Sequence, residues 1–368
     1  MQAKILSVNL RRLRKARGMT MEAAAKSAGI TRMAYHNIEN GKADPRVKNL
    51  QNLANALGVK VFDIVRPVPE LNNVRFRARK LGNERARQNV EQIKSNVALW
   101  LRDFNNLEDL LNLDPKKKLK VAVSGISDRS AFAKKMAEKA REWFGLEKDE
   151  VINDISGLIE SAGIKLHFLN LNIDNFWGFS ISDKKSGEAI IINNNNSIST
   201  ERKIFTIAHE LGHILMHPDS FDDKYDEIES QEKEADIFAG YFLMPEDAFH
   251  KRLKEVNGLH FVDAVLHLKR VFKVSYEAIL HRLVKENRAS NDIWQKFRGQ
   301  CAIKYKSNFK GHKEPFPLEA IDCIEDRLSC LVRLAYDKEL ISRSRAAEIL
   351  GITVNQMRDR INGWMVVK

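Results

Sequence analysis

Residues 205–217 read Phe-Thr-Ile-Ala-His-Glu-Leu-Gly-His-Ile-Leu-Met-His and contain an H-E-x-x-H motif from His209 to His213. Histidines at i and i+4 lie on one face of a helix, so their imidazoles can converge on a single metal ion. Glu210 then projects beside that metal, where its carboxylate can take a proton from water. The motif is typical of zinc peptidases, and it predicts a helix over Glu201–Met216 with Thr200 as its N-cap.

A third protein ligand has to come from elsewhere in the chain, because a catalytic zinc keeps three ligands and leaves the fourth position to water. The best candidate is Glu232 on the next predicted helix, with Asp236 one turn later. If Glu232 binds the metal, Asp236 is placed to hydrogen-bond a ligand histidine and fix its tautomer. Glu229 and Glu234 remain alternatives for the third ligand, and Zn²⁺ is the expected cofactor.

The surroundings of the motif predict an α+β domain. Before the motif we expect two helices and three strands, and after it more helices; the ranges are Ala131–Phe144, Val151–Ala162, Lys165–Leu169, Phe176–Ile181 and Glu188–Asn193. The strand segment Ile190–Asn193 is a candidate to pair with an extended substrate. His217 lies roughly 80° round the helix from His209, which favours a structural role or a place behind the ligands. Tyr241 and His217 are weak candidates for stabilising an oxyanion.

The positive charge of the chain is concentrated at its N-terminus. Residues 1–80 hold 17 of the 61 Lys and Arg but only 5 of the 49 Asp and Glu, so they account for the whole net charge of +12. Such asymmetry indicates binding to a polyanion, most simply DNA, although a solvated basic face gives the same pattern.

The same region has the pattern of a helix-turn-helix domain. Glycines and capping threonines divide residues 5–64 into five short helices, with Thr20 and Thr31 as N-caps of the second and third. In such a unit the helix after the tight turn, here Arg32–Glu39, fits the DNA major groove.

This segment resembles the Xre/Cro-type repressor family through Leu13–Thr20, Ala24–Arg32, Ile38–Gly41 and Leu53–Val59. The resemblance implies DNA contacts by six residues, the first four at base edges and the last two near phosphates: Arg32, Met33, His36, Asn37, Arg46 and Lys48. Met21 and His36 depart from the family's usual residues. Dimerisation or docking of a partner is the alternative role for the domain.

Residues 130–285 resemble the ImmA/IrrE family of metallopeptidases. The resemblance is carried by Phe205–His217, by Glu232–Ala239 and by Phe242-Leu243-Met244-Pro245, which occur in that order. Members are small bacterial proteases that cleave Xre-type repressors and are often encoded beside them in mobile elements or stress regulons. The resemblance implies that His209, His213 and Glu232 bind zinc and that Glu210 is the catalytic base. A subset of the family carries a fused Xre-like domain.

The length of 368 residues predicts two or three domains. The predicted elements indicate a mainly α protein with a small β-sheet. The predicted segments are residues 1–66 (helix-turn-helix), 67–129 (helical connection), 130–290 (peptidase) and 291–368 (helical, with a second helix-turn-helix pattern over 342–361). Within the connection, residues 71–115 are predicted to be mostly helical. The last segment carries no excess charge, which favours packing, dimerisation or regulation over DNA contact. Ile321–Asp337 is predicted to be one helix.

Three cysteines without C-x-x-C spacing suit a reducing cytosol. No apolar run of about 18 residues exists, so no membrane association is expected.

Two functions remain open at this point. The first is a cytoplasmic zinc endopeptidase that cleaves a transcriptional repressor or antitoxin, with its DNA-binding domain placing it at an operator or docking the target. The alternative is a DNA-binding regulator or toxin–antitoxin component whose peptidase fold senses metal or binds a partner without cleaving. The expected partners are DNA and a protein substrate, and a homodimer is left open.

Overall fold

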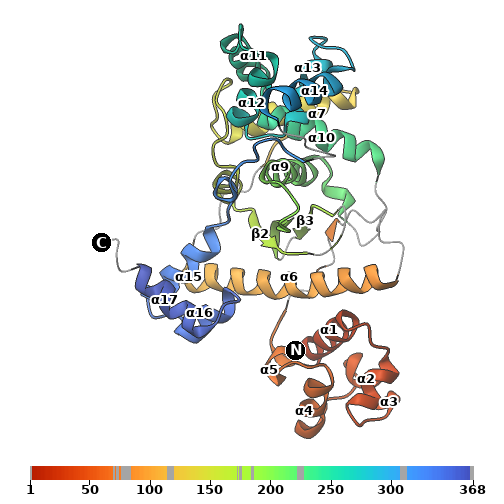
Figure 1. The fold of residues 1–368 in the computed structure, drawn as a ribbon. Coiled ribbons are helices and arrows are strands. Elements are labelled where there is room, and N and C mark those ends of the chain that lie inside the picture. The colour runs from red at the N-terminus through yellow and green to blue at the C-terminus, as the bar shows by residue number, and fades with distance from the viewer. Residues whose placement is uncertain are drawn as a thin grey trace. The chain divides into compact units, whose positions relative to one another are not determined.

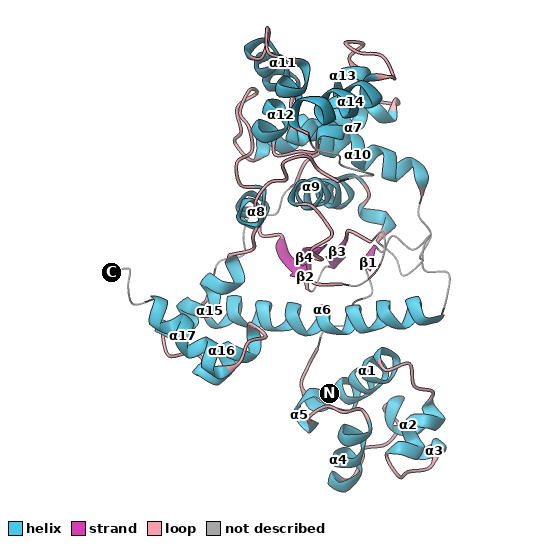
Figure 2. Ribbon diagram, viewed as in Figure 1, coloured by secondary structure: helices cyan, strands magenta, loops and turns pink. Residues whose placement is uncertain are grey.

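The computed structural model describes residues 2–68, 71, 74–75, 84–113, 120–171, 173, 176–183, 186–221, 228–306 and 313–364. The described chain is mainly helical with one small sheet, which confirms the expected fold class (Figures 1 and 2). It falls into two compact units. The first comprises Met1–Asn72, Arg79–Leu113 and Leu328–Lys368, and the second Asn73–Ala78 and Asp114–Arg327.

Five N-terminal helices form, and the second and third begin after the predicted N-cap threonines. They are α1 (Gln2–Ala16), α2 (Met21–Ser27), α3 (Arg32–Glu39), α4 (Val47–Ala56) and α5 (Val61–Val65). The Thr20 and Thr31 side chains accept hydrogen bonds from the Ala23 and Ala34 amides, both at 3.1 Å. Each threonine thus satisfies an amide that would have no partner at the start of its helix.

The remainder of the first unit is α6 (Glu84–Leu110) with the C-terminal helices α15 (Arg327–Asp337), α16 (Arg343–Ile349) and α17 (Val354–Trp364). On α16, Arg345 donates a hydrogen bond of 2.7 Å to Asp103 of α6. This hydrogen bond joins α16 to α6; whether the C-terminal helices serve packing, dimerisation or regulation stays a prediction. The predicted helix Ile321–Asp337 was wrong at its start, because residues 320–322 form the separate 3₁₀ turn η2 (Ala320–Asp322).

The sheet of the second unit has the strand order β1-β3-β4-β2, with β1 (Val74–Arg75), β2 (Lys165–Leu169), β3 (Gly178–Asp183) and β4 (Gly187–Asn193). β4 pairs antiparallel with β3 and parallel with β2. The prediction that Ile190–Asn193 pairs with a substrate was therefore wrong, since both of its edges are taken. The mostly helical prediction for 71–115 missed β1, a two-residue strand that forms by pairing with β3.

Helix α9 (Thr200–Met216) lies between the sheet and α10 (Glu229–Leu243), and it carries the H-E-x-x-H motif (Figure 1). Its N-cap is Ser199 rather than the predicted Thr200, because the Ser199 hydroxyl accepts the Arg202 amide. Two glycines permit the close packing of α9. A Cβ at Gly178 of β3 would lie 2.8 Å from Thr206 Cγ2 of α9, and one at Gly212 of α9 would lie 3.0 Å from the Phe238 ring of α10.

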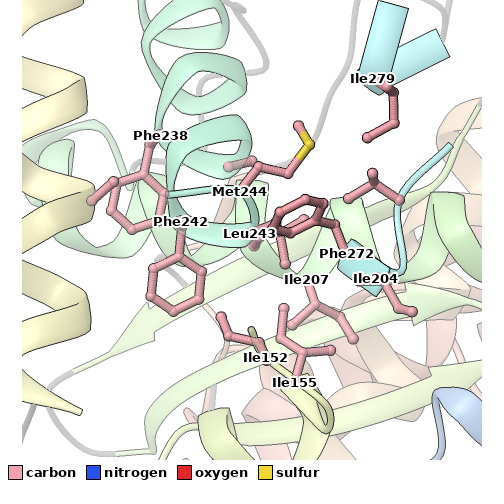
Figure 3. Packing of buried hydrophobic residues seen from close by; sticks show 14 of the residues in the cluster. Ile152, Ile155, Ile204, Ile207, Phe238, Phe242, Leu243, Met244, Phe272 and Ile279 are labelled. Carbon is pink, nitrogen blue, oxygen red and sulfur yellow. The ribbon is translucent and has the colours of Figure 1, made fainter. Parts of the chain in front are cut away.

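The remaining helices of this unit contribute to an apolar core around α9 and α10. They are α7 (Arg129–Trp143), α8 (Ile155–Ser161), α11 (Glu246–Glu255), α12 (Phe261–Phe272), α13 (Tyr276–Lys285) and α14 (Ile293–Tyr305), with the 3₁₀ turn η1 (Pro218–Ser220). Figure 3 shows Ile204 and Ile207 of α9 in one cluster with Phe242 and Leu243 of α10. This buried packing fixes the two helices that carry the predicted metal ligands.

Candidate metal centre

Helices α9 and α10 bring His209, His213 and Glu232 together. The two histidine Nε2 atoms are 2.9 Å apart. The Glu232 oxygens lie 3.3 Å from His209 Nε2 and 3.2 Å from His213 Nε2. Among the described residues, these three are the group whose donor atoms cluster closely enough to hold a metal ion.

The spacing of these donors fits zinc. A tetrahedral zinc with bonds of about 2.0–2.1 Å to nitrogen or oxygen separates its ligand atoms by about 3.3 Å. The observed separations are 2.9, 3.3 and 3.2 Å. Two imidazoles and one carboxylate are also a ligand set that catalytic zinc sites use, leaving one position for water.

The far side of each histidine is held by a hydrogen bond. His209 Nδ1 lies 2.8 Å from Asp236 Oδ1, and His213 Nδ1 lies 3.0 Å from His217 Nδ1. His217 Nε2 lies 2.8 Å from a Glu234 oxygen. One set of tautomers satisfies all three contacts: Nδ1–H donates from both ligand histidines, and Nε2–H donates from His217 to Glu234. Both ligand histidines then present an unprotonated Nε2 to the shared position.

The contacts of the three candidate glutamates distinguish which of them faces the proposed metal position. Glu234 binds His217 and also pairs with Arg129 at 3.2 Å. Glu229 pairs with Lys233 at 2.9 Å. Glu232 alone of the three faces both histidines, and Asp236 lies behind His209 as the i, i+4 spacing predicted. His217 lies behind His213, in the position expected of a supporting residue.

Glu210 is buried beside the sheet. Its Oε2 accepts a hydrogen bond of 2.6 Å from the Ser180 hydroxyl on β3, and only 2% of Glu210 and 0% of Ser180 are exposed. Sequence reasoning missed Ser180. The available signal was a hydroxyl between Phe179 and Ile181, both of which are buried.

The two candidates for oxyanion stabilisation differ in their surroundings. Both nitrogens of His217 are engaged by His213 and Glu234, so its imidazole is a supporting group. The Tyr241 ring is surrounded by cations, with the Arg282 guanidinium 4.0 Å, Lys285 Nζ 4.9 Å and Lys134 Nζ 5.2 Å from its centroid.

The residues predicted to contact DNA lie on α3 and at the start of α4. Met33 is 67% exposed, and Arg32, Arg46 and Lys48 are exposed, while His36 and Asn37 are half-buried on α3. Arg46 is the N-cap residue of α4 and Lys48 lies in its first turn.

Fold and site together define the class: a helix-turn-helix DNA-binding domain joined to a metallopeptidase-type domain. Residues 10–64 match the helix-turn-helix family model. Residues 159–284 match the model of the IrrE N-terminal-like domain, which is a peptidase family.

One curated relative is the uncharacterised HTH-type transcriptional regulator y4dJ of Sinorhizobium fredii (strain NBRC 101917 / NGR234). It is 34% identical over 67 residues, which are 18% of this chain and 87% of the relative. The chain therefore belongs to the helix-turn-helix family through its N-terminal domain, and it joins that domain to an IrrE-like peptidase-family domain.

The crystal structure of ComR from Streptococcus suis aligns with 95% of this chain and 94% of its own at 14% identity. The TM-score of 0.17 is too low to support a structural argument. Among the described helices, none is both long enough and apolar enough to cross a membrane.

Proposed function

We propose that this protein is a zinc-dependent endopeptidase that cleaves a transcriptional repressor or antitoxin. Its helix-turn-helix domain binds DNA at the operator or docks the target. The observation that carries the proposal is the convergence of the His209, His213 and Glu232 donors, with Glu210 directly after His209 on α9. Ligand set, base and spacing are those that hydrolysis of a peptide bond requires.

In this mechanism His209, His213 and Glu232 hold the metal, and Asp236 and His217 fix the tautomers of the two histidines. Zinc, when bound, supplies Lewis-acid activation of the attacking water and the scissile carbonyl. Ser180 donates to Oε2 of Glu210, which leaves Oε1 to accept the proton of the water. As the carbon–nitrogen bond breaks, Glu210 returns that proton to the leaving amine.

The test is cleavage of purified helix-turn-helix repressors encoded near this gene, followed by mass spectrometry of the fragments. Wild-type protein supplied with zinc should cut one of them. Glu210→Gln should lose activity by about 10²–10⁴-fold while keeping its zinc, because it removes the base and leaves the ligands. Glu229→Gln, whose carboxylate pairs with Lys233, should cleave like wild type. Cleavage by Glu210→Gln at the wild-type rate would contradict the mechanism.

A second candidate is a DNA-binding regulator whose peptidase fold senses metal without cleaving. It is favoured by the match to an HTH-type transcriptional regulator and by the basic N-terminal charge. Gel shifts with the DNA upstream of the gene measure the binding it requires. Arg32→Ala should weaken a shift by about 1–3 kcal/mol if α3 reads bases. A shift unchanged by Arg32→Ala would rule out this assignment of the recognition helix.

A further inference from the structure

A groove of about 1410 Å³ opens in the second unit beside the candidate metal centre. Its lining includes Asp236, whose carboxylate binds His209, together with Phe205 and Arg202 of α9. Phe205 and Arg202 precede His209 by four and seven residues, so all three share one face of α9. Pockets for drug-sized ligands have volumes of about 300–1,000 Å³, so this groove is large enough for a segment of polypeptide.

Two cations of α13 line one wall of the groove, next to Tyr241 of α10. Lys285 and Arg282 lie against the Tyr241 ring, with Nζ and the guanidinium carbon 4.9 and 4.0 Å from its centroid. Arg282 is held by Glu286 at 2.6 Å. Lys285 is different, because it makes no ion pair with a carboxylate among the described residues. Burial, and then the neighbouring Arg282, lower the pKa of Lys285.

The carboxylates that line the groove are engaged by the protein itself. Asp236 accepts from His209 at 2.8 Å. Glu201 binds Lys269 and accepts from the Leu318 amide at 2.8 Å. Glu314 lies 3.7 Å from the same Lys269. Glu277, the fourth carboxylate of the lining, accepts a hydrogen bond of 3.3 Å from the Tyr276 hydroxyl. Four cations line the same groove, so the formal charges balance, but Lys285 and Lys313 pair with no carboxylate among the described residues. An anionic partner would therefore meet these lysines, and Lys285 is the one that lies on the wall with Tyr241.

We propose that this groove binds the polypeptide substrate and that Lys285 pairs with an acidic side chain of it. The apolar lining from Phe176, Phe205, Ile237 and Met244 accepts flanking apolar residues. The preferred substrate segment is therefore extended, acidic and partly apolar. This inference rests on the proposed peptidase function and names the substrate class of the same site.

The experiment measures binding rather than cleavage. The full chain carrying Glu210→Gln is supplied with zinc and titrated against two fluorescein-labelled peptides of about a dozen residues. The peptides share their apolar residues and differ only in carrying Glu or Lys at the polar positions. Fluorescence anisotropy should show that the acidic peptide binds at least about tenfold more tightly, a difference of about 1.4 kcal/mol.

Charge reversal tests the assigned residue. Adding Lys285→Glu should abolish the preference for the acidic peptide and raise affinity for the basic one, and that gain also shows that the variant is folded. Lys254→Glu, a reversal at an exposed residue outside the groove lining, should leave both affinities unchanged.

Three results would overturn the groove assignment: equal affinity for the two peptides, no effect of Lys285→Glu, or displacement of the acidic peptide by single-stranded DNA with higher affinity. If a repressor is cleaved but the acidic peptide is not preferred, the groove assignment fails and the peptidase stands. If the acidic peptide binds as expected and no repressor is cut, the peptidase proposal fails instead.

Discussion

Glu210 is positioned by a hydroxyl from a different element, and that contact leads to a prediction about rate. Ser180→Ala removes the donor to Glu210 Oε2. A hydrogen bond to a charged group contributes about 1.5–3 kcal/mol, so cleavage should slow by about ten- to a hundredfold. Zinc content should not change, because the Ser180 hydroxyl binds Glu210, which is not one of the proposed ligands.

Ser182→Ala provides the matched control for this measurement. Ser182 lies two residues further along β3 and is half-buried. It should cleave at the wild-type rate, with kcat and KM followed on the same substrate. A Ser180→Ala enzyme as fast as Ser182→Ala would mean that the contact with Glu210 does not position the base.

Glu160 at the end of α8 sets a pH dependence of stability. Burial, with Glu325 adding to it, raises the pKa of Glu160 to about 8. The pKa of a glutamate in the unfolded chain is about 4.3. Between about pH 4.3 and pH 8 the folded state therefore binds the Glu160 proton more tightly than the unfolded state does. The stability supplied by the protonated group is present at low pH and is lost as pH rises toward 8, by at most about 1.4 kcal/mol per pH unit.

Glu160→Gln should remove this loss because the amide does not ionise. The variant should be more stable than wild type at pH 8, and the difference should shrink toward pH 5. Urea denaturation at both pH values, followed by tryptophan fluorescence, measures it. An equal difference between the two proteins at pH 5 and pH 8 would show that Glu160 does not titrate with folding.

At the scale of elements, some parts of the chain could be predicted from sequence and others could not. Helix α9 could be predicted, because its amphipathic pattern, its H-E-x-x-H motif and Pro218 after its end are all read from neighbouring residues. Strand β1 could not, because Val74 and Arg75 become a strand only by pairing with Ile181 and Ser180. A two-residue pairing carries no periodicity that a sequence pattern can display.

Some residues of the candidate site could also be predicted from local sequence patterns, and others could not. His209 and His213 share a helical turn, so spacing was enough to predict that they converge. On the next helix, spacing pointed to Glu232 and Asp236 but left Glu229 and Glu234 open as alternatives. Ser180 reaches Glu210 across 30 residues of sequence. The groove draws on α13 and on residues 313–317, which no local pattern connects to α9. Contacts between distant elements therefore account for what sequence reasoning missed.

Helices α1 and α3 are joined by a buried ion pair. Arg14 donates two hydrogen bonds of 2.7 Å to Glu39, which is 0% exposed. Arg14→Ala leaves that carboxylate buried without its partner, which costs about 3–5 kcal/mol. In Arg14→Ala, hydrogen exchange of the α1 and α3 amides, measured by mass spectrometry, should therefore be faster than in the wild type.

Arg11 supplies the control for the α1–α3 pair. It is 45% exposed and 3.9 Å from the same carboxylate. Exposed pairs of this kind contribute about 0–1 kcal/mol, so Arg11→Ala should leave exchange nearly unchanged. If the two variants exchange alike, the buried pair does not stabilise the domain.

At the scale of the whole molecule, one chain combines two kinds of chemistry. The net charge of +12 is accounted for by the first 80 residues, where the helix-turn-helix domain lies. The remaining residues balance their charges and carry the IrrE-like domain with its candidate metal centre. Under the proposed function, the first part brings the second to a repressor or to the DNA that the repressor occupies.

The most direct test of this account is zinc per chain, measured by elemental analysis of the wild type, Glu232→Ala and Glu229→Ala. The account predicts about one zinc per chain for the wild type and for Glu229→Ala, with zinc lost or greatly weakened in Glu232→Ala. No zinc in the wild-type protein after zinc is supplied, or full retention in Glu232→Ala, would contradict the three-ligand centre on which the proposed peptidase depends.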